Sequence, residues 1–476
     1  MRPNSVPTDK SILFITAFFI IALLLGFFAS QYPHRTLFWA VGALAIFLVA
    51  FINTEFGLYI LIFSMLLSPE FGVSQIEGRA ALGRGVTLRL DDFLLAVIGF
   101  SWFAKNAIHK ELGLLLRTPL NKPIFYFITA CIVSTGIGIM AGRVNAKTGF
   151  FYVLKYFEYI IVYFMVANHI ESRSQINRFL FCMFLTCFIT AIYGMMQIPG
   201  GGRVSAPFEG ALGEPNTFGG YLVFIGALAA GMFPKIDNFR MKILLGCMIL
   251  FIIPPFLFTE SRTSYMAAIP ACFVLGYQTD RKPLIIGLIV ILLLLSPFLV
   301  PKRVKDRVLF TISQREHAEQ IQVGEIRLDT STSARLISWR NAFLDWTKKP
   351  IIGYGVTGYG FIDAQIPRIL TETGIVGLIA FLYLLYSIFR LALDNLKKLK
   401  SPYLVGLLNG FIAGYVGLLF HAIGANTFII VRIMEPFWLM VGIISVLPFV
   451  HSDEDSTGYN SDSSPGKRLR GVRGLV

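Results

Sequence analysis

The chain has 476 residues, of which 55% are apolar and only 15% are charged, and its mean hydropathy is +0.67. Soluble proteins carry about 25% charged residues, so this composition excludes an ordinary soluble domain and favours an integral membrane protein. The formal net charge is +14, and the charged residues lie mainly between apolar stretches. Orientation in the membrane and binding of anionic lipid or substrate explain this pattern better than a nucleic-acid partner does.

Apolar runs of roughly 20 residues recur along the chain, each long enough to cross a hydrocarbon core of about 30 Å. They predict an all-α integral membrane protein with about 12–14 transmembrane helices and one long extracytoplasmic loop that contains short helices. The first run has no convincing small-residue cleavage site and is interpreted as a retained helix. The spans are expected near 11–30, 36–52, 54–68, 91–104, 123–141, 149–167, 179–198, 216–233, 243–258, 263–278, 283–300, 369–389, 402–423 and 428–448.

The distribution of basic residues predicts the orientation of these spans. With the N-terminus inside, Lys and Arg gather in inside loops such as 105–122 and 390–400, and the short outside loops carry fewer. By the positive-inside rule, both termini are cytoplasmic and the loop 301–365 is extracytoplasmic. We therefore expect N-terminal transmembrane helices over 1–200, and a second region over 201–450 that includes this loop. A disordered cytoplasmic tail is expected over 451–476, rich in Ser, Asp and Gly and ending in the basic run KRLRGVR.

A glycine-rich segment, GGGRVSAPFEG at 200–210, precedes the span that begins near residue 216. Glycine-rich backbone can approach a ligand closely, and Arg203 supplies a fixed cation beside it. Pro215 and Asn216 then open a helix, where exposed N–H groups and the helix dipole favour an anion. The alternative interpretation is an ordinary flexible loop with a capping turn.

A tight hairpin, Glu260–Ser261–Arg262, separates the ninth and tenth spans. It holds Arg262 at the membrane face, where a diphosphate headgroup would lie, although an arginine at the end of a span is often a snorkelling anchor. Glu260 is either a structural partner of Arg262 or a proton acceptor.

Within the long loop, Arg335 and Arg340 flank Trp339. The apolar positions that follow have helical spacing and predict an amphipathic surface helix over 335–348, which could still deliver its arginines inward.

Proline and glycine at 350–355 predict a turn before the chain re-enters the membrane. Asp363, Gln365 and Arg368 then lie at or near the start of a helix that leads to Glu372. Each alone could be a cap or an interfacial residue, but together they concentrate donors and acceptors beside a bilayer, which is costly without a purpose.

No HxxxH or CxxC pair suggests a metal, and no GxxxxGK[ST] loop suggests a nucleotide, so no metal or cofactor is expected. The five cysteines lie in apolar stretches and are interpreted as small buried hydrophobes. His421, near the outer end of the thirteenth span, is expected to be a core histidine satisfied by a neighbouring carbonyl.

Several of these motifs match a known family in order and placement. SRTSYMAA after a span, RLISWRNAFLDWTKKPIIGYGVTGYG in the long loop and QIPRILTETGIVGLIAFLYLL at the next helix resemble the O-antigen polymerase and O-antigen ligase family. EPNTFGGYL is similar to the PN-containing segment of that family. The resemblance covers about Arg203 to Ser445, and the region before it matches in topology alone.

The resemblance implies a glycosyltransferase of the bacterial inner membrane that needs neither nucleotide sugar nor metal. Such proteins take a glycan on undecaprenyl diphosphate at the outer face and transfer it to another glycan chain or to lipid A core. Membrane lipids are then further partners, and a chain-length regulator is a partner that the resemblance suggests.

Matching positions in the family motifs nominate site residues. Arginines would bind the leaving diphosphate and stabilise its growing charge, and a base would take the proton of the acceptor hydroxyl. The catalytic candidates are Asp363, Glu260 and Arg262, with Glu209, Glu214, His421 or a substrate phosphate as alternative bases. The candidates for binding diphosphate or glycan are Arg203, Arg262, Arg335, Arg340, Gln365, Arg368 and Asn216.

One departure from the family pattern bears on the reaction. Asp363 stands where ligases of the family usually carry a histidine, shortly before the Glu of the ETG-like motif. This favours a polymerase of O-antigen or exopolysaccharide, with a ligase as the alternative.

A flippase or other transporter is a further alternative, because Lys155 with Glu158 and Arg432 with Glu435 are charged pairs within or near spans. Against it, most polar groups lie in non-repeating outer loops, whereas transporters place them near the bilayer midplane.

Overall fold

The computed structural model describes residues 34–72, 87–108, 118–209, 213–279, 282–314, 320–323 and 326–457. The expected first span near 11–30 lies outside these ranges. The expected tail lies partly outside them, and its residues 451–457 continue the last helix, which runs to Thr457.

Every expected span that falls within the described residues coincides with a helix, which confirms the all-α membrane fold. Eight of the described helices are long and apolar enough to cross a membrane, and 41–52, 54–67 and 282–296 are shorter apolar helices. The helices of the bundle are α2 (His34–Ile52), α3 (Thr54–Leu67), α4 (Leu90–Ile108), α5 (Asn121–Met140), α6 (Ala146–His169), α7 (Arg173–Gln197), α8 (Pro215–Met232), α9 (Phe239–Phe258), α10 (Arg262–Tyr277), α11 (Lys282–Leu299), α14 (Gln365–Leu396), α15 (Pro402–His421) and α16 (Val431–Thr457).

Short elements connect these helices. A two-stranded antiparallel sheet, β1 (Glu70–Gly72) with β2 (Thr87–Arg89), leads from α3 to α4. Single turns of 3-10 helix end α7 at η1 (Ile198–Gly200) and α8 at η2 (Phe233–Lys235), and a third, η3 (Thr427–Ile429), precedes α16.

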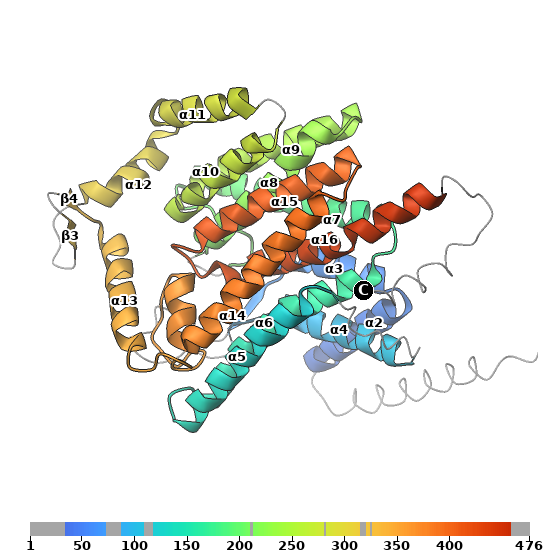
Figure 1. Cartoon of the computed structure of the whole chain (residues 1–476), viewed down its shortest axis with the longest axis horizontal. Coiled ribbons are helices and arrows are strands. Elements are labelled where there is room, and N and C mark those ends of the chain that lie inside the picture. The colour runs from blue at the N-terminus through green and yellow to red at the C-terminus, as the bar shows by residue number, and fades with distance from the viewer. Residues whose placement is uncertain are drawn as a thin grey trace, which may run out of the picture.

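The long loop forms an arm at one side of the bundle, running from α11 to the start of α14 (Figure 1). It contains α12 (Lys302–Ser313), the hairpin of β3 (Gln322–Val323) and β4 (Ile326–Arg327), and α13 (Thr330–Trp346). The expectation of short helices in this loop is confirmed. The helix expected over 335–348 begins earlier because the Asp329 side chain caps it, accepting the Thr332 N–H at 3.1 Å.

Small residues bring the central helices close together. A Cβ added to Gly231 of α8 would lie 2.3 Å from the backbone nitrogen of Gly410 in α15, so no larger side chain fits between these two helices. Close approach through glycine is a common way for membrane helices to associate, because packing replaces the hydrophobic effect there. Phe411, Tyr415 and Phe437 pack beside this contact and join α15 to α16.

The turn predicted at 350–355 is confirmed, and it is clasped to an interruption of α14. Gly374 has φ 67° and ψ −168°, a conformation open to glycine, and it breaks the helical hydrogen-bond pattern. The freed Ile375 N–H donates to the Pro350 carbonyl at 2.9 Å, and the Gly355 N–H donates to the Glu372 carbonyl at 2.8 Å. The end of the arm is thereby fixed to the bundle.

Candidate functional site

The α9–α10 turn is the centre of the candidate site. Pro254 and Pro255 lie in the last turn of α9, and the Ser261 side chain caps α10 by accepting the Ser264 N–H. Between the helices, Glu260 has φ 50°, a left-handed conformation that is rare outside glycine. Such conformations persist where the surroundings hold them, and here two arginines do so.

Arg203 fastens the glycine-rich segment to this turn. Its Nε donates to the Thr259 carbonyl at 2.9 Å, and its Nη2 donates to the Glu260 carbonyl at 3.3 Å. The same Nη2 donates to the Asn216 side chain at 3.2 Å, near the start of α8. The structure therefore brings Arg203, Asn216 and the α9–α10 turn together.

Arg262 points from the turn toward the arm. Its Nη1 donates to the Thr311 hydroxyl at 2.6 Å, and its Nη2 lies 2.8 Å from the Asp329 carboxylate at the start of α13. Glu260 is not its partner, contrary to one alternative considered above. The Glu260 carboxylate instead lies 2.5 Å from Nε of Arg303. Nη2 of Arg303 also donates to the Gly202 carbonyl of the glycine-rich segment at 2.8 Å.

Four guanidinium groups gather here, on Arg203, Arg262, Arg303 and Arg307, and we call them the guanidinium cluster. Burial lowers the pKa of Arg203, and the nearby positive charges of Arg307 and Arg262 lower it further. The negative charge of Glu260 opposes this effect. The buried Nε of Arg307 has no hydrogen-bond partner among the described residues.

The acidic partners of this cluster do not balance it. Burial alone would raise the pKa of Asp329, but hydrogen bonds from Arg262 and Thr332 and the charge of Arg262 outweigh this effect and lower it. Among the described residues, four guanidinium groups face two carboxylates, those of Asp329 and Glu260. The excess of planar, bidentate donors is suited to a multivalent anion such as a diphosphate.

A second pair lies on the arm between α13 and the start of α14. Arg335 donates to Oδ2 of Asp363 from Nη2 at 2.9 Å and from Nε at 3.3 Å. Oδ1 of Asp363 has no hydrogen-bond partner among the described residues, and both side chains are partly exposed. Asp329, the partner of Arg262, caps α13, and Arg335 lies within the same helix. One element therefore carries both the Arg262 contact and the Arg335–Asp363 pair.

His421 is buried, as expected of a core histidine. Its Nε2 donates to the Asn216 carbonyl at 3.1 Å, and its Nδ1 accepts from the Thr427 hydroxyl at 2.8 Å. The Ser264 hydroxyl lies 3.3 Å from Nε2. This histidine holds the starts of α8 and α10 against the end of α15, and its ring nitrogens are already occupied.

Besides Arg335, three predicted binding residues have no contact with the guanidinium cluster. The buried side chain of Gln365 accepts the Phe428 N–H at 3.0 Å. Arg368 is also buried, 3.2 Å from the Glu372 carboxylate and over the Tyr152 ring at 5.7 Å, and its contacts lie on α14 and α6. Arg340 is exposed, and it makes no hydrogen bond or ion pair with another residue in the described part of the chain.

Sequence reasoning did not single out Arg303 and Arg307. Their spacing places both on one face of α12, which turns them toward Arg203 and Glu260. The available signal was the basic run directly after the eleventh span, combined with apolar residues at 308–310 and 312. That pattern is typical of a helix lying at a membrane surface.

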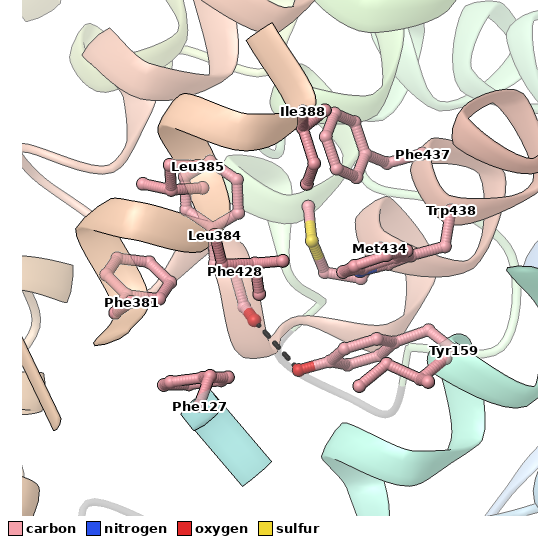
Figure 2. A pocket seen from close by; sticks show the side chains of 11 residues that line it. Phe127, Tyr159, Phe381, Leu384, Leu385, Ile388, Phe428, Met434, Phe437 and Trp438 are labelled. Atoms are coloured by element: carbon pink, nitrogen blue, oxygen red, sulfur yellow. Dashed lines mark hydrogen bonds between the residues drawn. The ribbon is translucent and has the colours of Figure 1, made fainter. Parts of the chain in front are cut away.

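An apolar crevice lies deeper in the bundle, between α14, α16 and the neighbouring α5 and α6 (Figure 2). Phe381 and Leu384 line one side, Met434 lines another, and the Tyr159 hydroxyl donates to the Phe428 carbonyl at 3.1 Å. Its volume of about 10 Å³ is that of a single water-sized sphere, so it is too small for a lipid chain in this state.

Comparison with known proteins bears on the same elements. Residues 244–382 match the family model described as O-antigen ligase. The match runs from α9 through the arm to the first half of α14, and it includes the α9–α10 turn, Arg303, Arg307, Arg335 and Asp363. No curated protein matches the sequence. The motifs and the matched region agree: residues 244–382 are similar to the O-antigen ligase family, and the long apolar helices are those of a multi-pass membrane protein.

Proposed function

We propose that this protein polymerises oligosaccharide repeat units carried on undecaprenyl diphosphate into O-antigen or exopolysaccharide. The reaction would take place at the periplasmic face of the bacterial inner membrane, with both termini of the chain in the cytoplasm. The observation that carries this proposal is the excess of guanidinium groups at the α9–α10 turn. Three of the four lie inside the region that matches the O-antigen ligase model.

The proposed reaction is a displacement at the anomeric carbon of the lipid-linked glycan. A hydroxyl group of the acceptor sugar attacks this carbon, and the bond between the carbon and the diphosphate oxygen breaks. Its electron pair goes to the diphosphate, where negative charge grows in the transition state. Preorganised guanidinium donors stabilise such charge without having to reorganise, and this is the role of Arg262, Arg303 and Arg307 in the proposal.

Asp363 is the preferred acceptor for the hydroxyl proton. Its Oδ1 is without a partner among the described residues, whereas the Glu260 carboxylate is held 2.5 Å from Arg303. Arg335 donates twice to Oδ2 and so fixes the orientation of the carboxylate. A fixed carboxylate with one available oxygen has the geometry that a general base requires. Glu260 then has a structural role, holding α12 against the turn.

A ligase that transfers the lipid-linked glycan to lipid A core is the second candidate. It would use the same leaving group and the same arginines, and the matched family model carries the ligase description. The carboxylate of Asp363, at a position where ligases usually carry histidine, favours the polymerase.

Deleting the gene in its host separates these reactions. A polymerase mutant should accumulate single repeat units on the lipid, whereas a ligase mutant should accumulate full-length chains on the lipid. Unchanged lipid-linked and surface glycans would contradict both assignments and favour a transporter.

Complementation of this deletion tests the guanidinium cluster itself. Arg307→Gln breaks no ion pair with a described residue, so it removes a cation without leaving an orphaned carboxylate. It should fail to restore the polymer at normal protein level. Arg390→Gln is the matched control, because Arg390 is exposed near the opposite end of α14 and lies 3.6 Å from Asp394. Full polymer from Arg307→Gln would contradict a role of Arg307 in binding the diphosphate.

A further inference from the structure

A second group of charged side chains lies where α3, α4, α6, α16 and the segment 206–209 meet. It includes the charged pairs of the sixth and last spans that the proposed reaction does not use. We call this group the acid cluster, and its members are the carboxylates Asp91, Asp92, Glu158, Glu209 and Glu435 and the cations Arg89, Lys155 and Arg432.

The cations of the acid cluster are shared among several acceptors. Lys155 lies 3.3 Å from the Asp92 carboxylate and 3.7 Å from that of Glu158. Arg89 lies 3.8 Å from Asp91, beyond hydrogen-bond distance. Asp91 and Glu158 each keep a buried carboxylate oxygen that has no hydrogen-bond partner among the described residues.

Arg432 is directed mainly at backbone carbonyls. Its Nη1 donates to the Pro207 carbonyl at 2.9 Å and its Nη2 to the Phe208 carbonyl at 3.2 Å, with further bonds to the end of α3. Its closest approach to the Glu209 carboxylate is 3.6 Å. Arg432 therefore compensates the carboxylates only in part, because its donors are divided among neutral acceptors.

Glu435 carries the strongest evidence for a ligand. Its side chain is 1% exposed, its Oε2 has no hydrogen-bond partner, and it forms no ion pair with any described residue. The charged groups that act on it most strongly are Asp91, Asp92 and Glu158, which repel its negative charge, and Arg89, which attracts it. An ionised carboxylate buried without a partner is strongly unfavourable, so this environment requires neutralisation of Glu435.

The charge balance supports this requirement. Among the described residues of the acid cluster, five carboxylates face three cations, so full ionisation would leave negative charge in excess. A metal ion does not fit, because no three His, Cys, Asp or Glu side chains among the described residues are grouped to hold one. A proton on a carboxylate removes one of these negative charges. Outside the spans, burial raises the pKa of Glu209 to about 8 although Arg432 opposes this effect.

We propose that the acid cluster is a proton-binding site that holds a proton on Glu435 at neutral pH. This assignment goes beyond the proposed glycan transfer and does not depend on it. Oε2 of Glu209 accepts the backbone N–H groups of Ala206 and Glu214 at 3.1 Å and 2.8 Å. Glu209 thus connects the proton site to the segment that carries Arg203 and leads to Asn216.

Infrared spectroscopy of the full-length protein in lipid vesicles tests the proton on Glu435. A protonated carboxyl group has a carbonyl stretch separated from the amide and carboxylate bands, and this band shifts in D₂O. The band should be present in the wild type at neutral pH and should lose one component in Glu435→Gln. Glu55→Gln is the matched control, because Glu55 pairs with Arg178 at 2.7 Å, and its spectrum should keep the band unchanged.

A second measurement keeps the test independent of the folding of that variant. Wild-type protein labelled with ¹³C at the glutamate carboxyl group should show the isotope shift in the protonated band, which assigns the band to glutamate. Absence of any protonated band at neutral pH would overturn the proposal. The proposal would also be overturned if the carboxylates were ionised and the wild type were stabilised by NaCl but not by choline chloride. The ligand of the acid cluster would then be a metal cation.

Discussion

The contact between Arg262 and Asp329 allows the structural and chemical roles of Arg262 to be separated. Asp329 is 1% exposed and lies 2.8 Å from Nη2 of Arg262, so Arg262→Ala leaves a buried carboxylate with only the Thr332 N–H as partner. Breaking a buried pair in this way costs about 3–5 kcal/mol, and we expect the lower end because Arg262 is partly exposed.

The double variant Arg262→Ala/Asp329→Asn should recover most of this loss. Asparagine is neutral and is as good a helix cap as aspartate, so α13 keeps its start and the remaining deficit should be about 1 kcal/mol. Transfer activity should not recover. Loss of one preorganised donor to the leaving group lowers the rate by about 10²–10³-fold, and both variants lack it.

Two assays on the same purified protein decide the matter. Thermal unfolding followed by tryptophan fluorescence reports stability, and consumption of lipid-linked glycan reports transfer. If the double variant regains both stability and near-wild-type transfer, then Arg262 is only an anchor between the turn and the arm. Asp329→Asn alone should stay active, because it removes a carboxylate and leaves every guanidinium group in place.

Three further predictions follow from contacts described above. Burial raises the pKa of Glu209 from 4.5 to about 8, so between these pH values the folded chain binds a proton that the unfolded chain has lost. The free energy of unfolding should therefore be highest below pH 4.5 and should fall by about 5 kcal/mol as the pH rises to 8. Glu209→Gln should remove this slope in melting experiments across pH; an unchanged slope would contradict the burial argument. Gly374→Ala places a Cβ 2.2 Å from the Ile351 carbonyl oxygen at a residue with positive φ, so it should lower the free energy of unfolding by about 2 kcal/mol or more. The control Gly136→Ala has open space around its Cβ and should be nearly neutral in the same melting assay. Asp363→Asn should lower transfer by about 10²–10⁴-fold with little change in melting temperature, and retained activity would exclude Asp363 as the base.

The spans were predictable because a bilayer imposes one length on every apolar helix. The starts of α8 and α10 follow local rules of proline and serine placement, so Pro215 and Ser261 marked them in the sequence. Orientation relative to the membrane stays a prediction from the distribution of basic residues.

The partners within the site were not predictable from spacing. Arg262 pairs with Asp329 across three helices and a hairpin, and Glu260 pairs with Arg303 on α12, from which sequence reasoning named no site residue. Such choices depend on how the arm folds back over the α9–α10 turn, and no local pattern encodes that. Arg368 was misplaced for the same reason, since its position near the start of α14 does not reveal that it faces Tyr152 inside the bundle.

The backbone hydrogen bonds between residues 350–355 and the interruption of α14 at Gly374 separate two parts of the arm that are attached to the bundle in different ways. Downstream of Trp346, backbone hydrogen bonds to α14 hold the chain as part of the rigid bundle. Upstream, α12 and the start of α13 are held to the α9–α10 turn through single side chains, Arg303 and Arg262. A rearrangement that breaks these two contacts would therefore separate α12, with Arg303 and Arg307, from the turn, whereas Arg203 stays bonded to the Thr259 and Glu260 carbonyls.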